Sequence, residues 1–138
     1  MRLRQLPPRV VSGAYILHAG LEKWHGDEAR AQAVHTMAVT AYPVLKDLSP
    51  PSFLRGLAAG EIAVGAVLLA PMAPAWLAGA ALTGFSGALL GLYARVPGMH
   101  KPGSIWPDQK GIAISKDIFM FGIGLGLLAD AVSAKGRD

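Results

Sequence analysis

Cysteine is absent from the 138-residue chain, and charged residues make up only 16% of it. The first absence excludes disulfides, thiolate zinc sites, iron–sulfur clusters and any thiol relay carried by this chain itself. Phosphate-binding loops, nucleophile elbows, zinc signatures and dinucleotide fingerprints are also missing from the sequence. The net charge of +4 is scattered, with no run of Lys or Arg longer than two residues, so we expect no nucleic-acid partner.

Charge is missing altogether from Met72 to Ala94, a stretch of 23 residues. A bilayer core about 30 Å thick needs about 20 apolar helical residues, so this stretch is long enough to cross it. The alternative, a helix buried in a soluble core, would need a larger domain than 138 residues provide. With three further apolar runs, the sequence predicts an all-α integral membrane four-helix bundle, a single domain over residues 1–138. We expect its spans at about 8–24, 53–70, 74–94 and 112–132.

The long first connection has a helical pattern of its own. Asp27 and Glu28 suit a helix N-terminus, and alanine and valine then recur at helical spacing as far as Pro43. We therefore expect a short additional helix at the membrane interface between the first two spans. The connection between Pro71 and Pro74 is a tight turn, which predicts that the second and third spans are antiparallel neighbours.

Four spans place both termini on the same side of the membrane. The termini are rich in basic residues for their length, namely Arg2, Arg4, Arg9, Lys135 and Arg137. The positive-inside rule therefore favours cytoplasmic termini. The basic N-terminus precedes an apolar run, as in a signal peptide, but no persuasive cleavage site lies before Glu22 and Lys23. We expect this segment to be retained as the first span.

Glycine pairs at four-residue spacing occur in three of the predicted spans. Such pairs remove side chains and let helix backbones approach closely. The glycines that this pattern assigns to helix packing are Gly56, Gly60, Gly87, Gly91, Gly122 and Gly126. General packing of small residues is the alternative to a specific dimer motif, since glycine is abundant throughout the chain.

The ionisable residues of the spans converge on one half of the predicted bundle. Antiparallel topology brings the end of the first span to the same side as the starts of the second and fourth, at similar depths. Tyr15, His18 and Glu22 share one face of the first span, which we expect to point at the bundle axis. Arg55 and Lys116 would neutralise Glu22 and Glu61. The predicted polar cluster comprises Tyr15, His18, Glu22, Arg55, Glu61, Lys116 and Asp117.

Each of these residues has a plainer alternative. Glu61 lies too deep in its span to reach water easily, so we expect it to be buried and paired. In the plainer alternative, some side chains only extend to water at the membrane interface, namely those of Lys23, Arg95, Lys116 and Asp117. His18 is expected to be a hydrogen-bonded core histidine rather than a ligand. The loop histidines are expected to be solvated and no metal site is expected; they are His25, His35 and His100.

Short motifs in three spans carry a family resemblance. They are RVVSGAYILHAGLEK from Arg9, GEIAVGAVLLA from Gly60 and SKDIFMFGIGLGLLA from Ser115. These segments resemble the DoxX-like family of small four-span bacterial membrane proteins. The residues that carry the resemblance are Arg9, Gly13, His18, Gly20, Lys23, Glu61, Gly65, Lys116, Asp117 and Gly122.

The resemblance implies a four-helix bundle in a bacterial cytoplasmic membrane. It also implies a link to membrane redox systems, including thiosulfate–quinone oxidoreduction and a thiol-stress complex. We interpret the chain as a non-catalytic or accessory subunit, without an intrinsic cofactor, that helps a redox protein partner meet quinone at the polar cluster; if it is catalytic, it is part of a quinone-linked membrane oxidoreductase. The alternative is a structural or interaction protein, in which buried charges serve helix packing and the loops dock a partner. A small-molecule carrier ranks last, because four spans make a small pathway without homo-oligomerisation.

Overall fold

A computed structural model describes residues 1–136, and this part of the chain is helical, without a β-strand. Arg137, one of the basic residues used to orient the termini, lies outside the described residues. The α-helices are α1 (Leu6–Trp24), α2 (Glu28–Ala41), α3 (Pro50–Leu69), α4 (Ala75–Arg95), α5 (Ile112–Ser115) and α6 (Asp117–Lys135). Short 3₁₀ turns lie at Leu3–Gln5, Pro43–Asp47 and Gln109–Gly111.

The helix ends follow local sequence signals. The Asp27 carboxylate accepts a hydrogen bond from the Arg30 backbone N–H at 2.8 Å, so the expected helix in the first connection does begin here. Ser49 caps α3 ahead of two prolines, whose fixed φ angles suit a first helical turn. The predicted all-α class and the additional helix are therefore confirmed over the described residues.

Three segments are long and apolar enough to cross a membrane: α3, α4 and the stretch from Gln109 to Lys135. The last of these bends at Lys116, where α5 ends and α6 begins. The first of the four expected spans, α1, is not among them, because it carries Arg9, Glu22 and Lys23.

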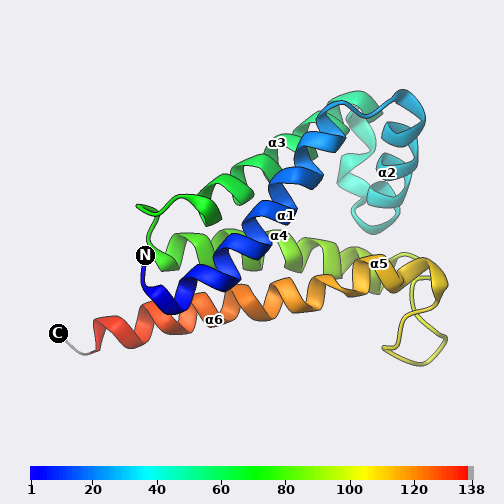
Figure 1. Ribbon diagram of the computed structural model, residues 1–138. Helices are drawn as coiled ribbons and strands as arrows, with labels where there is room; N and C mark the ends of the chain where they lie inside the picture. Colours follow the sequence, from blue (N-terminus) through cyan, green and yellow to red (C-terminus); the bar gives the residue numbers. More distant parts are fainter. Residues whose placement is uncertain (137–138) are drawn as a thin grey trace.

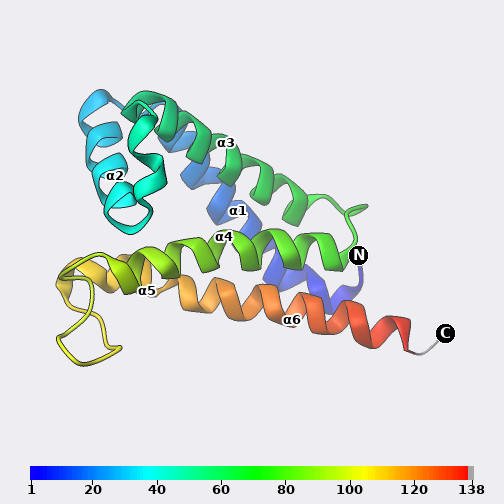
Figure 2. The same cartoon turned by 180° about the vertical axis from the view of Figure 1, so that it is seen from behind.

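The long helices form two pairs, in which α1 packs along α3 and α4 packs along α6. Figure 1 shows the two pairs as the arms of a V, close together near the chain termini and apart at the other end. The view from behind shows the same arrangement, with α2 and the loop 96–111 at the open end (Figure 2). The expected neighbours α3 and α4 are in contact, but they diverge from the Pro71–Pro74 turn, and each packs chiefly on another helix.

Close backbone contacts between glycines and facing helices create these pairs. A Cβ at Gly20 would lie 2.9 Å from the Glu61 Cβ, and one at Gly65 would lie 2.8 Å from the Leu17 backbone N. In the other pair, a Cβ at Gly79 would lie 2.9 Å from the Gly124 carbonyl oxygen. Only a residue without a side chain permits such an approach, so these glycines select which helices pack together.

The glycines predicted from four-residue spacing mostly lie elsewhere. Around Gly56, Gly60, Gly122 and Gly126 no atom of another element lies within 4 Å of an added Cβ. Gly87 makes only an ordinary contact with Phe121, and Gly91 faces the Tyr42 side chain. The assignment to close helix packing is therefore wrong within one chain for Gly56, Gly60, Gly122 and Gly126, whereas Gly91 does leave room for the Tyr42 side chain. Spacing along one helix does not say which face meets a neighbour.

The two pairs share a core where the arms of the V converge. This core contains buried side chains from all four long helices: Ile16, Leu68, Ala78, Leu82 and Leu127. At the open end, α2 bridges the arms through its C-terminal side. The Tyr42 hydroxyl donates to the Ala88 carbonyl at 2.7 Å, and Arg95 donates to the Ala41 carbonyl at 3.2 Å.

Candidate functional site

A buried ion pair joins α1 to α3. The Lys23 ammonium lies 3.0 Å from Glu61 Oε1, and the two side chains are only 18% and 6% exposed. The second carboxylate oxygen, Oε2, is buried without a hydrogen-bond partner in the described part of the chain. The expectation that Glu61 is buried and paired is confirmed, but its partner is Lys23 rather than Arg55 or Lys116. The placement of Lys23 among interfacial charges is therefore wrong.

Asp117 faces this pair from the other arm of the V. It begins α6, is partly buried, and lies close enough to Glu61 and Lys23 for their charges to interact. Arg30 on α2 contributes a further positive charge within range of Glu61. The open half of the molecule thus gathers two carboxylates and one ammonium from three helices, with a more distant guanidinium. Two of the predicted cluster residues, Glu61 and Asp117, are brought together here.

The column of Tyr15, His18 and Glu22 does not point at the axis of the fold, so that prediction is wrong. Tyr15 is 67% exposed, and the side chains of His18 and Glu22 are 74% and 57% exposed. The buried face of α1 is instead made by Arg9, Ser12, Gly13, Ile16 and Gly20. The glycines of this face let the α1 backbone lie close against α3, so this face points inward. Tyr15, His18 and Glu22 lie on the opposite side of α1 and are exposed.

A groove of about 490 Å³ runs between α1 and the α5–α6 segment. Its apolar lining includes Val11, Phe119, Met120 and Ile123, and its polar lining includes Ser12, Tyr15, Lys116 and Asp117. The Ser12 hydroxyl already donates to the Pro8 carbonyl. Tyr15, Lys116 and Asp117 are therefore the groups with which a bound molecule would exchange hydrogen bonds. Exposure of Tyr15 on this wall is what makes it available.

The remaining cluster residues lie apart from the carboxylates. The Arg55 guanidinium lies over the Trp24 ring, 5.8 Å from its centroid, on the exposed side of α3. Lys116 is exposed and forms no ion pair within residues 1–136. The proposal that these two cations neutralise Glu22 and Glu61 is therefore wrong. Arg95, expected at the interface, lies over the Tyr42 ring at 5.2 Å.

Arg9 is a polar centre that the sequence analysis did not single out. Its side chain is fully buried and donates to four backbone carbonyls, those of Val67, Leu68, Ala70 and Ala73, at 2.8–3.0 Å. These carbonyls belong to the end of α3 and the turn after it, which have no helical donors of their own. The sequence does contain a signal that Arg9 is buried. Helical spacing places Arg9 on one face with Gly13, Ile16, Gly20 and Lys23, and glycines mark a face that packs closely on another helix.

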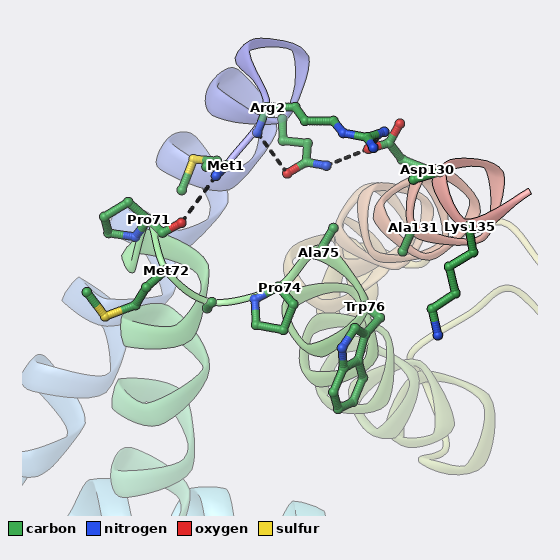
Figure 3. Close-up of a pocket in the computed structure, with 13 residues that line it drawn as sticks. Met1, Arg2, Pro71, Met72, Pro74, Ala75, Trp76, Asp130, Ala131 and Lys135 are labelled. Atoms are coloured by element: carbon green, nitrogen blue, oxygen red, sulfur yellow. Dashed lines mark hydrogen bonds and ion pairs between the residues drawn. The ribbon is translucent and has the colours of Figure 1, made fainter. Parts of the chain in front are cut away.

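A second hollow lies at the end of the molecule that holds the termini. Its volume is about 290 Å³, and Figure 3 shows Arg2, the Pro71–Pro74 turn, Trp76 and Lys135 around it. The Asp130 carboxylate at its edge already accepts hydrogen bonds from Arg4 and from the Gln5 amide. These hydrogen bonds tie the 3₁₀ turn Leu3–Gln5, directly before α1, to α6.

The histidines are not gathered with other potential metal ligands. Within residues 1–136 no group of three or more His, Asp or Glu side chains that could hold a metal ion occurs. His35, which we expected to be solvated, is partly buried against Phe53 and shares a hydrogen bond with the Leu45 carbonyl at 3.0 Å. Comparisons with known proteins found no matching family model, no matching curated protein and no matching solved structure.

Proposed function

We propose that the chain is an integral membrane protein with four spans, and that its groove between α1 and α6 binds a quinone. The observation that carries the proposal is this groove of about 490 Å³, with an apolar wall and three free polar side chains, Tyr15, Lys116 and Asp117. A quinone headgroup is a flat ring with two carbonyl oxygens, and it needs an apolar slot with a few donors. The Tyr15 hydroxyl and the Lys116 ammonium are donors, and Asp117 accepts from the hydroxyl of a reduced ring.

Burial of Arg9 and Lys23 supports α1 as the fourth span, although its composition alone is marginal and its third charge, Glu22, is exposed near the end of the helix. Arg9 is surrounded by carbonyl acceptors and Lys23 is paired with Glu61, so neither charge faces outward. The outward sides of the other helices are largely apolar: only 11% of the most apolar window between Gln109 and Lys135 is buried. Lipid would cover that surface, and a quinone dissolved in lipid would enter the groove from the side.

The redox role rests on the resemblance to the DoxX-like family. In this proposal the chain is an accessory subunit of a bacterial cytoplasmic membrane redox complex, and it presents quinone to a partner that supplies the electrons. The excess of basic residues at the termini favours their cytoplasmic location. The absence of cysteine in the sequence means that any thiol chemistry would belong to the partner.

The ion pair between α1 and α3 favours a second candidate function. Lys23 and Glu61 lock two helices together, and neither lines the groove of about 490 Å³, as expected of charges that serve packing. In that case the chain is a structural or interaction protein of the membrane. Binding of quinone to the purified protein separates the two candidates.

The test is a titration of decylubiquinone into the purified full-length protein in lipid nanodiscs, followed by tryptophan fluorescence. The wild-type protein should bind saturably. Tyr15→Phe should weaken binding of decylubiquinone by about tenfold, because one hydrogen bond of ~1.4 kcal/mol is lost. Asp117→Asn should weaken binding of the reduced form, decylubiquinol, by a similar factor in the same titration, because Asp117 accepts from the ring hydroxyl. Glu22→Gln is the matched control, because Glu22 lies outside the groove and is exposed.

A wild-type protein that binds decylubiquinone no better than empty nanodiscs would overturn the quinone proposal. Equal binding of decylubiquinone by wild type and Tyr15→Phe, together with equal binding of decylubiquinol by wild type and Asp117→Asn, would also overturn the site assigned here. Far-UV circular dichroism of each variant shows that the helices remain formed. If the wild-type protein binds no decylubiquinone but copurifies with a membrane protein partner, the structural candidate is supported.

A further inference from the structure

A third cavity, which is largely apolar and has a volume of about 440 Å³, lies between the loop 96–111 and the neighbouring ends of α4 and α6. It adjoins the proposed quinone groove, and Lys116 and Phe119 line both. The side chains that make its apolar floor are Leu90, Ile118 and Phe119. Ile105, Trp106 and Pro107 of the loop form its outer wall. The hollow is therefore a slot for a hydrocarbon chain between helices and loop.

The loop holds its apolar side chains outward by its own hydrogen bonds. The Lys101 N–H donates to the Trp106 carbonyl at 2.9 Å, and the Asp108 N–H donates to the Met99 carbonyl at 2.9 Å. The Tyr93 hydroxyl of α4 donates to the Ile105 carbonyl. With the loop closed in this way, Ile105 is 84% exposed and Trp106 is 70% exposed. Such exposure of two large apolar residues on a closed loop requires an apolar medium or partner to cover them.

The charged residue that lines this hollow is Lys116. Its side chain is exposed and has no ion-pair partner within residues 1–136. The acidic residue of the loop, Asp108, accepts a hydrogen bond from the Gln109 N–H at 2.8 Å as a turn cap and does not line the hollow. Lys116 therefore places one positive charge directly beside the apolar floor.

We propose that this hollow binds an anionic phospholipid, with its phosphate at Lys116 and an acyl chain on Leu90, Ile118 and Phe119. The proposal rests on the membrane insertion proposed above, but not on quinone binding. The loop follows α4 and precedes the Gln109–Lys135 segment, both long and apolar enough to cross a membrane, so it lies at the level of the headgroups. Tryptophan prefers that level, and a lysine near the surface attracts anionic headgroups. Charge and shape together select a phospholipid over a soluble ligand.

The first test counts lipids retained by the protein. Full-length protein is extracted from nanodiscs that contain equal amounts of phosphatidylglycerol and phosphatidylcholine, and native mass spectrometry measures the bound lipids. Wild type should retain phosphatidylglycerol in preference, and Lys116→Gln should reduce that preference about fivefold, the loss expected for one interfacial lysine. Lys135→Gln is the matched control, because Lys135 lies at the opposite end of the molecule beside the other hollow.

The second test places Trp106 in the bilayer. In a Trp24→Phe/Trp76→Phe background, Trp106 is the only tryptophan left, since the chain has three. Dibrominated phosphatidylglycerol should quench its fluorescence more strongly than dibrominated phosphatidylcholine, and Lys116→Gln should remove the difference.

Two outcomes would overturn the lipid site: equal quenching by both brominated lipids in the wild-type background, or unchanged phosphatidylglycerol retention in Lys116→Gln. Failure of membrane insertion is recognised separately, because the protein would then not float with liposomes in a density gradient. Failure of decylubiquinone binding leaves the lipid result standing, so the two proposals fail independently.

Discussion

The two ends of this molecule differ in how completely their charged side chains are hydrogen-bonded. At the end that holds the termini, the Arg9 guanidinium has four carbonyl acceptors and Asp130 is bonded to Arg4 and Gln5. At the open end, Glu61 has one partner and one unpartnered buried oxygen, and Asp117 faces it from the other arm. The first end is a closed structural joint, whereas the second keeps polar groups available beside a groove.

Side-chain chemistry explains part of this difference. Arginine offers five donors in a planar fork, which lets one residue satisfy the carbonyls of a helix end and the following turn. Lysine is a point charge with three donors on a flexible stem, and here it reaches only one oxygen of Glu61. We therefore expect stability to depend most on the arginine end, and ligand binding to depend on the open end.

The largest loss of stability should follow from Arg9→Met. The four carbonyls of the α3 end and turn would lose their donors in a buried place, which should lower the free energy of unfolding by about 3–5 kcal/mol. Unfolding of the purified protein in detergent micelles by sodium dodecyl sulfate, followed by far-UV circular dichroism, measures this. Arg55→Met is the control and should cost less than about 1 kcal/mol, since Arg55 only lies over Trp24. Equal losses in both variants would contradict the structural joint.

A smaller loss should follow from Lys23→Met, which leaves the buried Glu61 carboxylate without its cation. We expect about 3 kcal/mol, and addition of Glu61→Met should recover most of it, because removing both charges also removes the cost of burying them. The same unfolding assay on the two single variants and the double variant gives the coupling energy. Additive losses would show that the two residues do not interact.

Glycine variants test which helix faces meet. Gly20→Ala places a Cβ 2.9 Å from the Glu61 Cβ, so it should separate α1 from α3 and cost about 1–3 kcal/mol. Gly60→Ala meets nothing within 4 Å and should raise stability by up to about 1 kcal/mol, because alanine favours a helix over glycine. If Gly60→Ala were the more destabilising of the two variants, the helix packing predicted from glycine spacing would be correct. Both variants are compared by the same denaturant titration.

The smallest effect is expected on the outer face of α1. Glu22→Gln breaks only an exposed contact with His18 at 3.7 Å, and exposed pairs of this kind contribute little. The free energy of unfolding should change by less than about 0.5 kcal/mol. If Glu22→Gln lowered the free energy of unfolding as much as Lys23→Met, Glu22 would be buried, as predicted from the face that it shares with Tyr15 and His18.

Much of the fold could be predicted from composition and local signals. The charge-free stretch around α4, the Asp27 cap and the prolines at Pro50 and Pro71 mark helices and turns without reference to the rest of the chain. Burial of Glu61 was also predictable, because a carboxylate in the middle of an apolar helix must avoid lipid or find a partner.

The candidate site was only half predictable. Asp117 was placed correctly near Glu61, but Tyr15, His18 and Glu22 were assigned to the wrong side of α1, and Lys23 and Arg9 were undervalued. The polar column suggested one inner face and the small residues Gly13 and Gly20 another. Backbone contact is possible only where no side chain intervenes, so the glycine face becomes the inner one.

The sequence by itself determined where helices begin and end, which of them are apolar enough to cross a membrane, and that Glu61 needs a partner. Only the tertiary structure decided that α1 pairs with α3 and α4 with α6, that Lys23 is the partner, and that Arg9 binds the turn after α3. The physical reason is that composition and capping act within a few residues of one helix. The choice among facing surfaces depends on how closely two backbones can approach, and that choice involves residues about 40 or more positions apart along the chain.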